Sequence, residues 1–164
     1  MIDYIEIFVP GKPATSGSKK VFPKRDGKGF IVAPDNERQK NWQAAIREAA
    51  SEKVKVLTRY VGIPPDNWIT YPLICTIKLK CVFIIARPKG HFGTGKNANK
   101  LKSSAPDYPA VKPDSLKLAR AVEDALNGII YRDDSQICKH EIEKVYADQL
   151  NPVIGVRIFI SRLQ

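Results

Sequence analysis

Apolar residues alternate with other residues in several stretches, and each such stretch predicts a β-strand. Ile5, Ile7 and Val9 form the first stretch, which the Pro-Gly pair at positions 10 and 11 ends. The longest stretch extends from Leu73 to Ile85, and its apolar side chains all face one way. Three further strands are predicted at Ile129–Tyr131, His140–Tyr146 and Val153–Ile160.

One stretch in the first third of the chain has the period of a helix instead. Trp42, Ile46 and Ala50 recur four residues apart and form an apolar face. Asp35 or Asn36, which precede this face, can cap the first turn through a side-chain oxygen. We therefore predict an amphipathic helix that starts next to these two residues.

A second helix is predicted at residues 115–126. Leu118, Val122 and Leu126 form its buried stripe, and charged side chains gather on the opposite face. Asp114 precedes the helix and can accept from its first free amides. The Asn-Gly pair at positions 127 and 128 supplies the stop.

Two long basic segments connect these elements. Residues 11–34 are rich in glycine and proline and predict a loop or a loose hairpin, whereas residues 87–113 predict a long polar loop. The chain has 164 residues and shows no internal repeat or second domain. We expect a single α/β domain of the α+β kind, with a small mixed sheet flanked by helices.

The charge of the chain points to a polyanionic partner. Lys and Arg number 27 against 17 Asp and Glu, a formal net charge of +10 with a pI near 9.6. Such a surplus is typical of proteins that neutralise phosphates, although a membrane surface or RNA attracts it too. The surplus is concentrated between residues 87 and 120.

Composition argues against several other classes of protein. Three cysteines without a C-x-x-C pair argue against a disulfide framework or a zinc ribbon. No apolar run approaches the roughly 20 residues of a membrane span, and acidic residues interrupt the start, unlike in a signal peptide. We expect a reduced, cytoplasmic protein with no membrane association, and we expect Cys75 and Cys81 to pack in the core.

Residues 90–97 nearly match the phosphate-binding loop G-x-x-x-x-G-K-[ST]. Asn97 stands where a hydroxyl would have to hold Mg²⁺, and no apolar helical face follows it. We therefore expect no nucleotide cofactor. A basic, glycine-rich loop that contacts a nucleic-acid backbone explains these residues better.

Carboxylates follow one another around the second helix, in an otherwise basic part of the chain. The helix and the short strand after it should bring Asp114, Asp124 and Asp134 together. Their mutual repulsion then requires an offset, which Mg²⁺ provides because it prefers hard oxygen ligands.

Each of these acidic residues also has a purely structural interpretation. Asp114 serves as a helix cap in that interpretation, and Asp133 and Asp134 belong to a turn. Glu123 is then a surface partner for Arg120, three residues before it.

Three segments around the second helix form a set: K-P-D at 112–114, A-V-E-D-A-L-N-G at 121–128 and Y-R-D-D-S-Q-I at 131–137. With weaker likenesses at 9–13 and 87–89, this set resembles the RusA family of Holliday junction resolvases. Members are small, mostly phage-borne homodimers of an α/β fold. The resemblance implies an endonuclease that uses Mg²⁺ or Mn²⁺ to nick opposed strands of a four-way junction.

Position by position, the resemblance implies a catalytic set of Asp114, Asp124, Asp134 and Arg120. Arg120 stands where a lysine that supports catalysis is usual in the family. Glu123 and Asp133 are additional candidate metal ligands. Leu116 departs from the pattern, because the family has a second aspartate there and leucine cannot bind a metal. We expect a rearranged but working site.

Basic side chains of the two long segments are expected to hold the DNA backbone without reading bases. This predicted set comprises Lys19, Lys20, Lys24, Arg25, Arg87, Lys89, Lys96, Lys100, Lys102, Lys112 and Lys117. The expected activity is the Mg²⁺-dependent hydrolysis of phosphodiester bonds in branched DNA. It would serve recombination and repair in a bacterial, phage-infected or prophage-bearing cell.

Two other functions remain open from the sequence. A protein of the same fold could bind DNA junctions without cleaving them, with Leu116 marking the loss of catalysis. An RNA-binding domain is a weaker alternative, because aromatic residues make up only 9% of the chain and form no array on which bases could stack.

Overall fold

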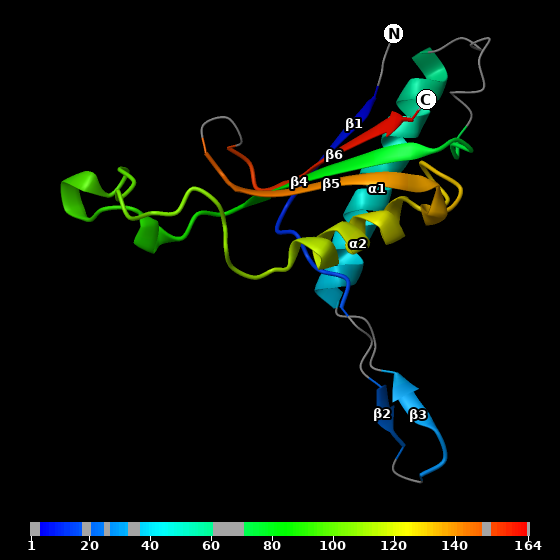
Figure 1. Ribbon diagram of the computed structural model, residues 1–164, viewed down its shortest axis with the longest axis horizontal. Coiled ribbons are helices and arrows are strands. Elements are labelled where there is room, and N and C mark those ends of the chain that lie inside the picture. The colour runs from blue at the N-terminus through cyan, green and yellow to red at the C-terminus, as the bar shows by residue number, and fades with distance from the viewer. Residues whose placement is uncertain are drawn as a thin grey trace.

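The computed structural model of the protein describes residues 4–17, 21–24, 27–32, 37–60, 71–148 and 152–163. Its helices and strands are β1 (Ile5–Pro10), β2 (Val21–Pro23), β3 (Phe30–Val32), α1 (Glu37–Tyr60), β4 (Ile77–Ile85), α2 (Ser115–Leu126), β5 (Ile137–Tyr146) and β6 (Gly155–Arg162). Three short 3-10 helices, at Lys89–His91, Gly95–Asn97 and Asp134–Gln136, complete the described elements. Figure 1 shows their arrangement.

Four strands form one mixed sheet in the order β1-β6-β4-β5. β6 lies antiparallel to both of its neighbours, and β4 and β5 run parallel. A parallel pair needs a crossover connection, which the segment with the long loop and α2 provides between β4 and β5. This mixed sheet with two helices is the α+β fold that the sequence predicts.

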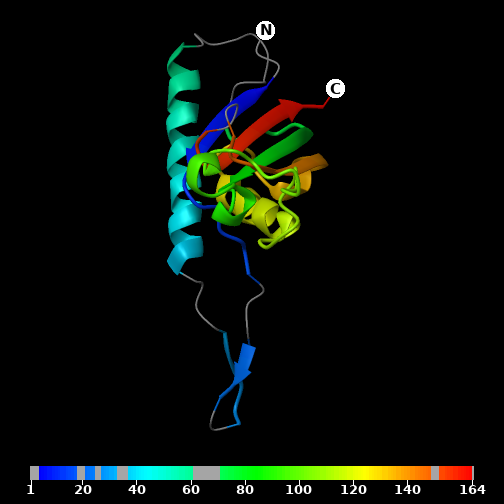
Figure 2. The same cartoon turned by 90° about the vertical axis from the view of Figure 1, so that its left-hand side faces the viewer.

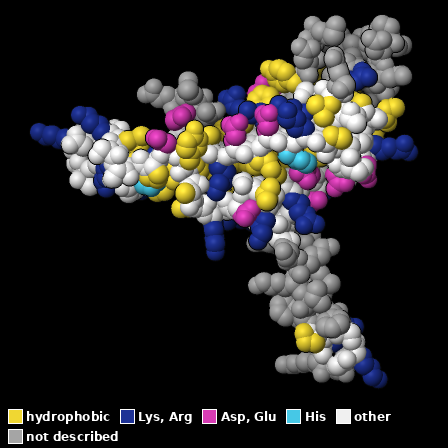
Figure 3. Space-filling view, viewed as in Figure 1, with side chains coloured by type: hydrophobic (Ala, Val, Ile, Leu, Met, Phe, Trp, Pro, Cys, Tyr) yellow, Lys and Arg dark blue, Asp and Glu magenta, His cyan; other side chains and the backbone are white. Residues whose placement is uncertain are grey.

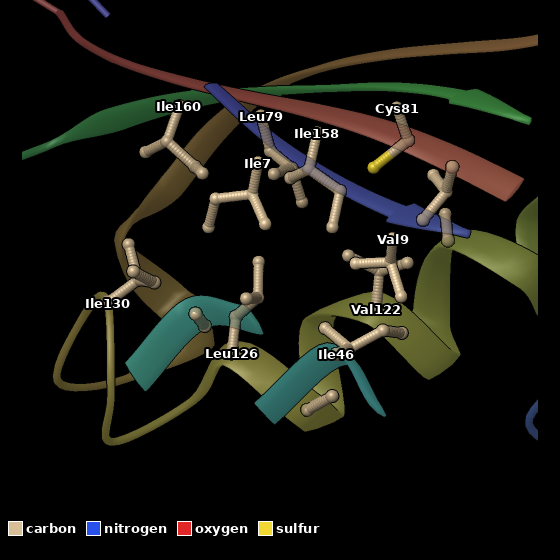
Figure 4. Close-up of a cluster of buried hydrophobic side chains, with 14 of the residues drawn as sticks. Ile7, Val9, Ile46, Leu79, Cys81, Val122, Leu126, Ile130, Ile158 and Ile160 are labelled. Carbon is tan, nitrogen blue, oxygen red and sulfur yellow. The ribbon is translucent and has the colours of Figure 1, made fainter. Parts of the chain in front are cut away.

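Both helices cover the same face of the sheet, and the core lies between them and the strands (Figures 2 and 4). Ile46 of α1 and Val122 of α2 are fully buried there, against Leu79 and Ile158 of the sheet. The predicted apolar stripes of both helices are therefore confirmed. Cys81 is buried in this core as expected, whereas Cys75 is only half-buried.

The opposite face of the sheet carries charged side chains that pair across the strands. Lys80 of β4 contacts both Glu141 and Glu143 of β5, and Lys78 contacts Glu141. On the same face, towards the other edge of the sheet, Arg157 Nη1 of β6 lies 3.5 Å from Glu6 Oε1 of β1. This pattern follows from the period of two, which sends alternate residues to opposite faces.

The predicted strands at both ends of the chain and in its middle are confirmed with shifted boundaries. β4 begins at Ile77 and not at Leu73, because the chain bends around Pro72 and Leu73 instead forms an isolated bridge with Tyr131. β5 begins three residues earlier than predicted and β6 two residues later.

The strand predicted at Ile129–Tyr131 is wrong. Residues 128–130 form a turn, in which the amides of Ile129 and Ile130 both donate to the Leu126 carbonyl at the end of α2, and Tyr131 forms only isolated bridges, with Leu73 and Asn127. Gly128, with a φ of 76°, starts the turn in the left-handed region that favours glycine. A run of three apolar residues is too short for its periodicity to separate a strand from a buried turn.

Both predicted helices are confirmed. α2 has the predicted bounds and its predicted cap, and α1 continues to Tyr60 over 24 residues. The proposed caps of α1, Asp35 and Asn36, lie outside the described residues. Within the described ranges, neither helix is sufficiently long and apolar to cross a bilayer.

The two basic segments project from the body of the molecule (Figures 1 and 2). In the first, β2 and β3 pair as an antiparallel hairpin, as the loose-hairpin interpretation predicts. In the second, residues 87–113 contain only short 3-10 helices and one isolated bridge, between Phe92 and Leu101. We call residues 87–106 the basic arm.

Candidate functional site

Asp114 lies at the start of α2 and caps it. Its Oδ1 accepts from the amides of Leu116 at 3.0 Å and Lys117 at 3.3 Å. The extended backbone of Asp114 turns the incoming chain into the helix. The structural interpretation of this residue is thus confirmed, but both bonds use Oδ1, so the cap does not require Oδ2.

A groove of about 1090 Å³ lies beside Asp114. It is formed by the segment after β1, the ends of β4 and β5, and the chain that enters α2. The charged side chains among its described lining residues are Lys12, Arg38, Lys112, Lys117, Lys144 and Asp114. In Figure 3, basic side chains gather below the middle of the body, where the chain enters α2. One carboxylate therefore sits among five cations.

The opposite end of α2 is acidic, and the buried Tyr131 lies next to it. The Tyr131 hydroxyl donates to the Glu123 carbonyl at 3.0 Å. Burial raises the pKa of this hydroxyl first, and the nearby charges of Glu123, Asp134 and Asp124 raise it further. All three carboxylates therefore lie near the Tyr131 hydroxyl.

Two of these carboxylates have partners within the fold. Asp124 Oδ2 accepts from the Ser16 hydroxyl at 2.9 Å, which ties the segment after β1 to α2. Glu123 Oε1 lies 3.1 Å from His140 Nε2 on β5. The structural interpretation predicts Arg120 as the partner of Glu123. In the structure the partner is His140.

The Asp133-Asp134 pair opens a short 3-10 turn. Asp133 accepts from the Ser135 amide at 2.9 Å, and Gln136 accepts from the Asp133 amide at 2.9 Å. Hydrogen bonds from Ser135 hold the pKa of the Asp133 carboxyl below its ordinary value. Gln136 also donates to the carbonyls of Leu73 and Cys75, so the turn is fixed to the end of the sheet.

The structure therefore divides the predicted carboxylates between the two ends of α2. The helix rises about 1.5 Å per residue, so Asp114 and Asp124 are on the order of 15 Å apart along its axis. Among the described residues, no three His, Cys, Asp or Glu side chains are placed to hold a metal ion together. One chain therefore supplies carboxylate oxygens, the hard ligands that Mg²⁺ prefers. These carboxylates form two separate groups, one at each end of α2.

The remaining residues of the predicted catalytic face are exposed on α2. Arg120 is exposed in the middle of the helix, between its basic and acidic ends. Leu116 is 70% exposed, although it is apolar. Its position, two residues after Asp114, is the one at which the resemblance described above implies a second carboxylate.

The basic arm is folded, with a defined base. The Arg87 guanidinium lies 4.1 Å above the ring of Tyr146 and donates to the Pro106 carbonyl at 2.9 Å. His91 packs edge-on against the same ring, at 5.4 Å between centroids. Lys102 donates to the Gly90 carbonyl across the arm. Arg87 and Pro106 are the two ends of the arm, so the hydrogen bond between them closes its base. The cation–π contact of Arg87 with Tyr146 restrains this base relative to the sheet.

The predicted DNA-binding residues fall into three places. Lys112 and Lys117 line the groove, and the basic arm carries Arg87, Lys89, Lys96, Lys100 and Lys102. Lys24 lies beside the hairpin, where it is exposed. Lys19, Lys20 and Arg25 lie outside the described residues.

Sequence reasoning missed several residues at this site. Lys12, Arg38 and Lys144 line the groove, but each comes from a different part of the chain. Lys144 had a signal, because it shares its face of β5 with the apolar Ile142, where a charged residue is unusual. No pattern in the sequence indicates Ser16, because its partner Asp124 is 108 positions away.

Comparison with known proteins gives two results. The chain matches the family described as endodeoxyribonuclease RusA over residues 10–159, which includes the groove, the basic arm and both ends of α2. A protein of Bacillus subtilis (strain 168), described as uncharacterized protein YqaN, is 29% identical over 164 aligned residues. The alignment covers 95% of this chain and 97% of that protein.

Proposed function

We propose that this chain, which belongs to the RusA endodeoxyribonuclease family, cleaves four-way DNA junctions by hydrolysing phosphodiester bonds with Mg²⁺ or Mn²⁺. The family supports a nuclease of the Holliday junction resolvase type that acts on branched DNA, and its members generally depend on a divalent metal. The observation that carries the proposal is the carboxylate of Asp114 at a groove lined by five cations.

The groove has the charge pattern that DNA cleavage requires. Lysine and arginine side chains neutralise backbone phosphates and fix the position of the duplex without reading its sequence. The Asp114 carboxylate would repel the same phosphates, and an uncharged asparagine would cap α2 equally well, so the negative charge needs a purpose beyond capping and binding. Metal-assisted hydrolysis supplies one, because a divalent ion between carboxylate and phosphate offsets the repulsion.

A homodimer would join the two halves of the carboxylate set. The beginning of α2 and the chain directly before it are basic, with Lys117 and Lys112, and the end of the helix is acidic, with Glu123 and Asp124. When two such helices lie antiparallel across a twofold axis, the basic end of each faces the acidic end of the other. Their helix dipoles then point in opposite directions, which is also favourable. This arrangement brings Asp114 of one copy next to the acidic end of the other.

In this proposal Asp114 of one copy and Asp124 and Asp134 of the other copy would hold the ion together, with Glu123 and Asp133 as further carboxylates at the acidic end of α2. A bound divalent ion lowers the pKa of a coordinated water and neutralises charge on the scissile phosphate. Arg120, exposed in the middle of the helix, stabilises the negative charge that grows on the phosphoryl oxygens. Two sites related by the twofold axis suit the two opposed strands of a junction.

The two projections extend the DNA-binding surface beyond the groove. The basic arm holds five of the predicted phosphate contacts and no acidic residue between positions 87 and 106. The hairpin presents Lys24, and the predicted contacts Lys19, Lys20 and Arg25 belong to the same segment of the chain. We propose that these surfaces hold different arms of the junction.

A second function in the same family follows from Leu116. A junction-binding protein that has lost cleavage would keep the groove, the basic arm and the cap of α2. The exposed leucine at a position where the family has a carboxylate favours this alternative. It predicts binding that weakens steeply with salt and yields no product.

Leu116→Asp separates the two functions. An aspartate at this position lies in the first turn of α2, where the helix dipole favours a negative charge by about 0.3–1 kcal/mol, so the variant should fold. If the natural site is rearranged but active, this variant should change the rate of cleavage less than tenfold. A protein that gains cleavage only on this substitution supports the binding function instead.

The direct test uses a labelled four-way junction and a linear duplex of the same sequence. Purified protein should nick the junction in Mg²⁺, prefer it to the duplex and lose activity when the metal is chelated. If no strand is cut at concentrations that saturate binding, with either Mg²⁺ or Mn²⁺, the proposed nuclease activity is wrong. Such an activity would serve recombination and repair in the cytoplasm of a bacterial, phage-infected or prophage-bearing cell.

A further inference from the structure

Alternate residues of β5 face α2 and follow its length. His140 lies 3.1 Å from Glu123, in the C-terminal half of the helix. Ile142 packs against the core. Lys144 reaches the segment that precedes the helix. His140, Ile142 and Lys144 thus follow α2 from its acidic end to its basic end, where the groove lies.

The Lys144 ammonium holds two backbone carbonyls of that segment. Its Nζ donates to the Val111 carbonyl at 2.7 Å and to the Pro113 carbonyl at 2.9 Å. These are short bonds from a charged donor, and such bonds are roughly twice as strong as neutral ones. An ammonium group has three protons to donate, so these two bonds leave one for the groove that Lys144 lines.

These bonds fix the chain directly before Asp114. Val111 is exposed, and it lies in a stretch without regular secondary structure. The carbonyl of Pro113 immediately precedes the residue that caps α2 through Oδ1. Lys144 therefore ties this turn to the C-terminal part of β5, where its neighbour in the sheet is the buried Phe83 of β4.

We propose that Lys144 is a positioning residue for DNA cleavage, which sets the place of the Asp114 carboxylate by holding the Val111–Pro113 turn against β5. This inference rests on the proposed function, in which Asp114 is a catalytic residue. A displacement of about 1 Å at a reacting group can cost on the order of a hundredfold in rate. The effect of Lys144 should accordingly appear in turnover more than in binding.

Lys144→Met is the primary variant, because methionine keeps much of the apolar stem and removes the three donors. We expect kcat for junction cleavage to fall about a hundredfold, with the Kd for the junction changed less than threefold. Lys139→Met is the matched control, since Lys139 is an exposed lysine on the same strand. The control should keep the kcat of the natural protein.

Hydrogen exchange measures the positioning without reference to activity. The amides of Leu116 and Lys117 donate to Asp114 Oδ1, so their exchange reports on the cap. In the Lys144→Met variant both amides should exchange several-fold faster, while amides in the middle of β4 keep their protection. Unchanged exchange at Leu116 and Lys117 would overturn the inference.

Restoring the amine chemically separates positioning from a loss of folding. Lys144→Cys, made with Cys138→Ser because Cys138 is exposed, can be alkylated with 2-bromoethylamine to give a lysine analogue. The alkylated protein should recover at least tenfold in kcat over the untreated variant and regain protection at the two amides. Recovery of junction affinity alone would assign Lys144 to phosphate binding and would overturn its positioning role.

The failure of this inference is distinguishable from the failure of the proposed function. If the natural protein cuts no DNA in Mg²⁺ or Mn²⁺, the proposed function falls, and with it the role of Lys144 in cleavage. If the natural protein cuts junctions and Lys144→Met cuts them equally fast, only the inference falls.

Discussion

At the scale of single residues, the central feature is the double use of Asp114. The same side chain caps α2 and faces a groove lined by five cations. Capping explains why the fold needs a small polar residue there, but asparagine would serve as well. A carboxylate is required only if the second oxygen has a chemical task.

Asp114→Asn tests this distinction directly. Asparagine caps helices about as well as aspartate, so the melting temperature should change by only a few degrees. Cleavage should fall at least a thousandfold, while junction affinity stays equal or increases because a negative charge has left the groove. Steady-state cleavage and electrophoretic mobility assays measure both.

The control for that substitution is Asp107→Asn, at an exposed position before the groove. It removes the same charge and should leave cleavage unchanged. Equal loss in both variants would assign the effect to overall charge, and full activity of Asp114→Asn would remove Asp114 from the reaction.

Tyr131 gives a prediction about stability at the same scale. Its ring is fully buried, and its hydroxyl donates to the Glu123 carbonyl, which also accepts from the Asn127 amide. Tyr131→Phe removes the donor but leaves the carbonyl with a partner. The free energy of unfolding, measured in urea, should fall by about 0.5–1.5 kcal/mol. A loss above about 3 kcal/mol would show that the hydroxyl has a further role.

At the scale of elements, the long periodic stretches were predictable and the short ones were not. The periods of 3.6 and 2 defined α1, α2, β1 and β4, because burial against one face selects those patterns. Residues 129–131 were misassigned, since the geometry after α2 depends on Gly128 and on bonds to Leu126. A short apolar run carries no information about such bonds.

The candidate site was less predictable than the fold. The sequence located Asp114 and its cap, because a residue that caps a helix is close to it in the chain. It could not show that α2 separates Asp114 from Asp124, since that depends on which ends of the elements meet. Lys12, Arg38 and Lys144 come together only through the sheet and α1.

The basic arm provides a prediction at this scale. Each phosphate contact contributes about 0.9 to the slope of log K against log salt concentration. Replacing Lys96, Lys100 and Lys102 by glutamine should reduce that slope by about 2.7 if all three contact DNA. Junction affinity should fall at low salt, and the two curves should converge as salt increases.

Lys53→Gln with Lys55→Gln on α1 is the control for the arm. These lysines lie far along α1 from the predicted contacts, and Lys55 pairs with Glu52 on the surface. Their replacement should leave the slope unchanged. An unchanged slope in the arm variant would remove the basic arm from the DNA-binding surface.

At the scale of the whole molecule, the proposed cleavage site requires two copies of the chain. One copy holds the predicted carboxylates at opposite ends of α2, and within its described residues no three of them are placed to share an ion. A twofold dimer with antiparallel α2 helices would place Asp114 of each copy beside Asp134 of the other. The cleavage site is then shared between copies, which makes a quantitative prediction for mixed dimers.

Subunit mixing of Asp114→Asn with Asp134→Asn tests that claim most directly. Each variant alone should be inactive, because both of its sites lack one carboxylate. After exchange, a mixed dimer holds one site with both carboxylates intact, so an equimolar mixture should recover about a quarter of the natural activity. A mixture that exchanges subunits, binds the junction and still cuts nothing would contradict a site shared between two copies.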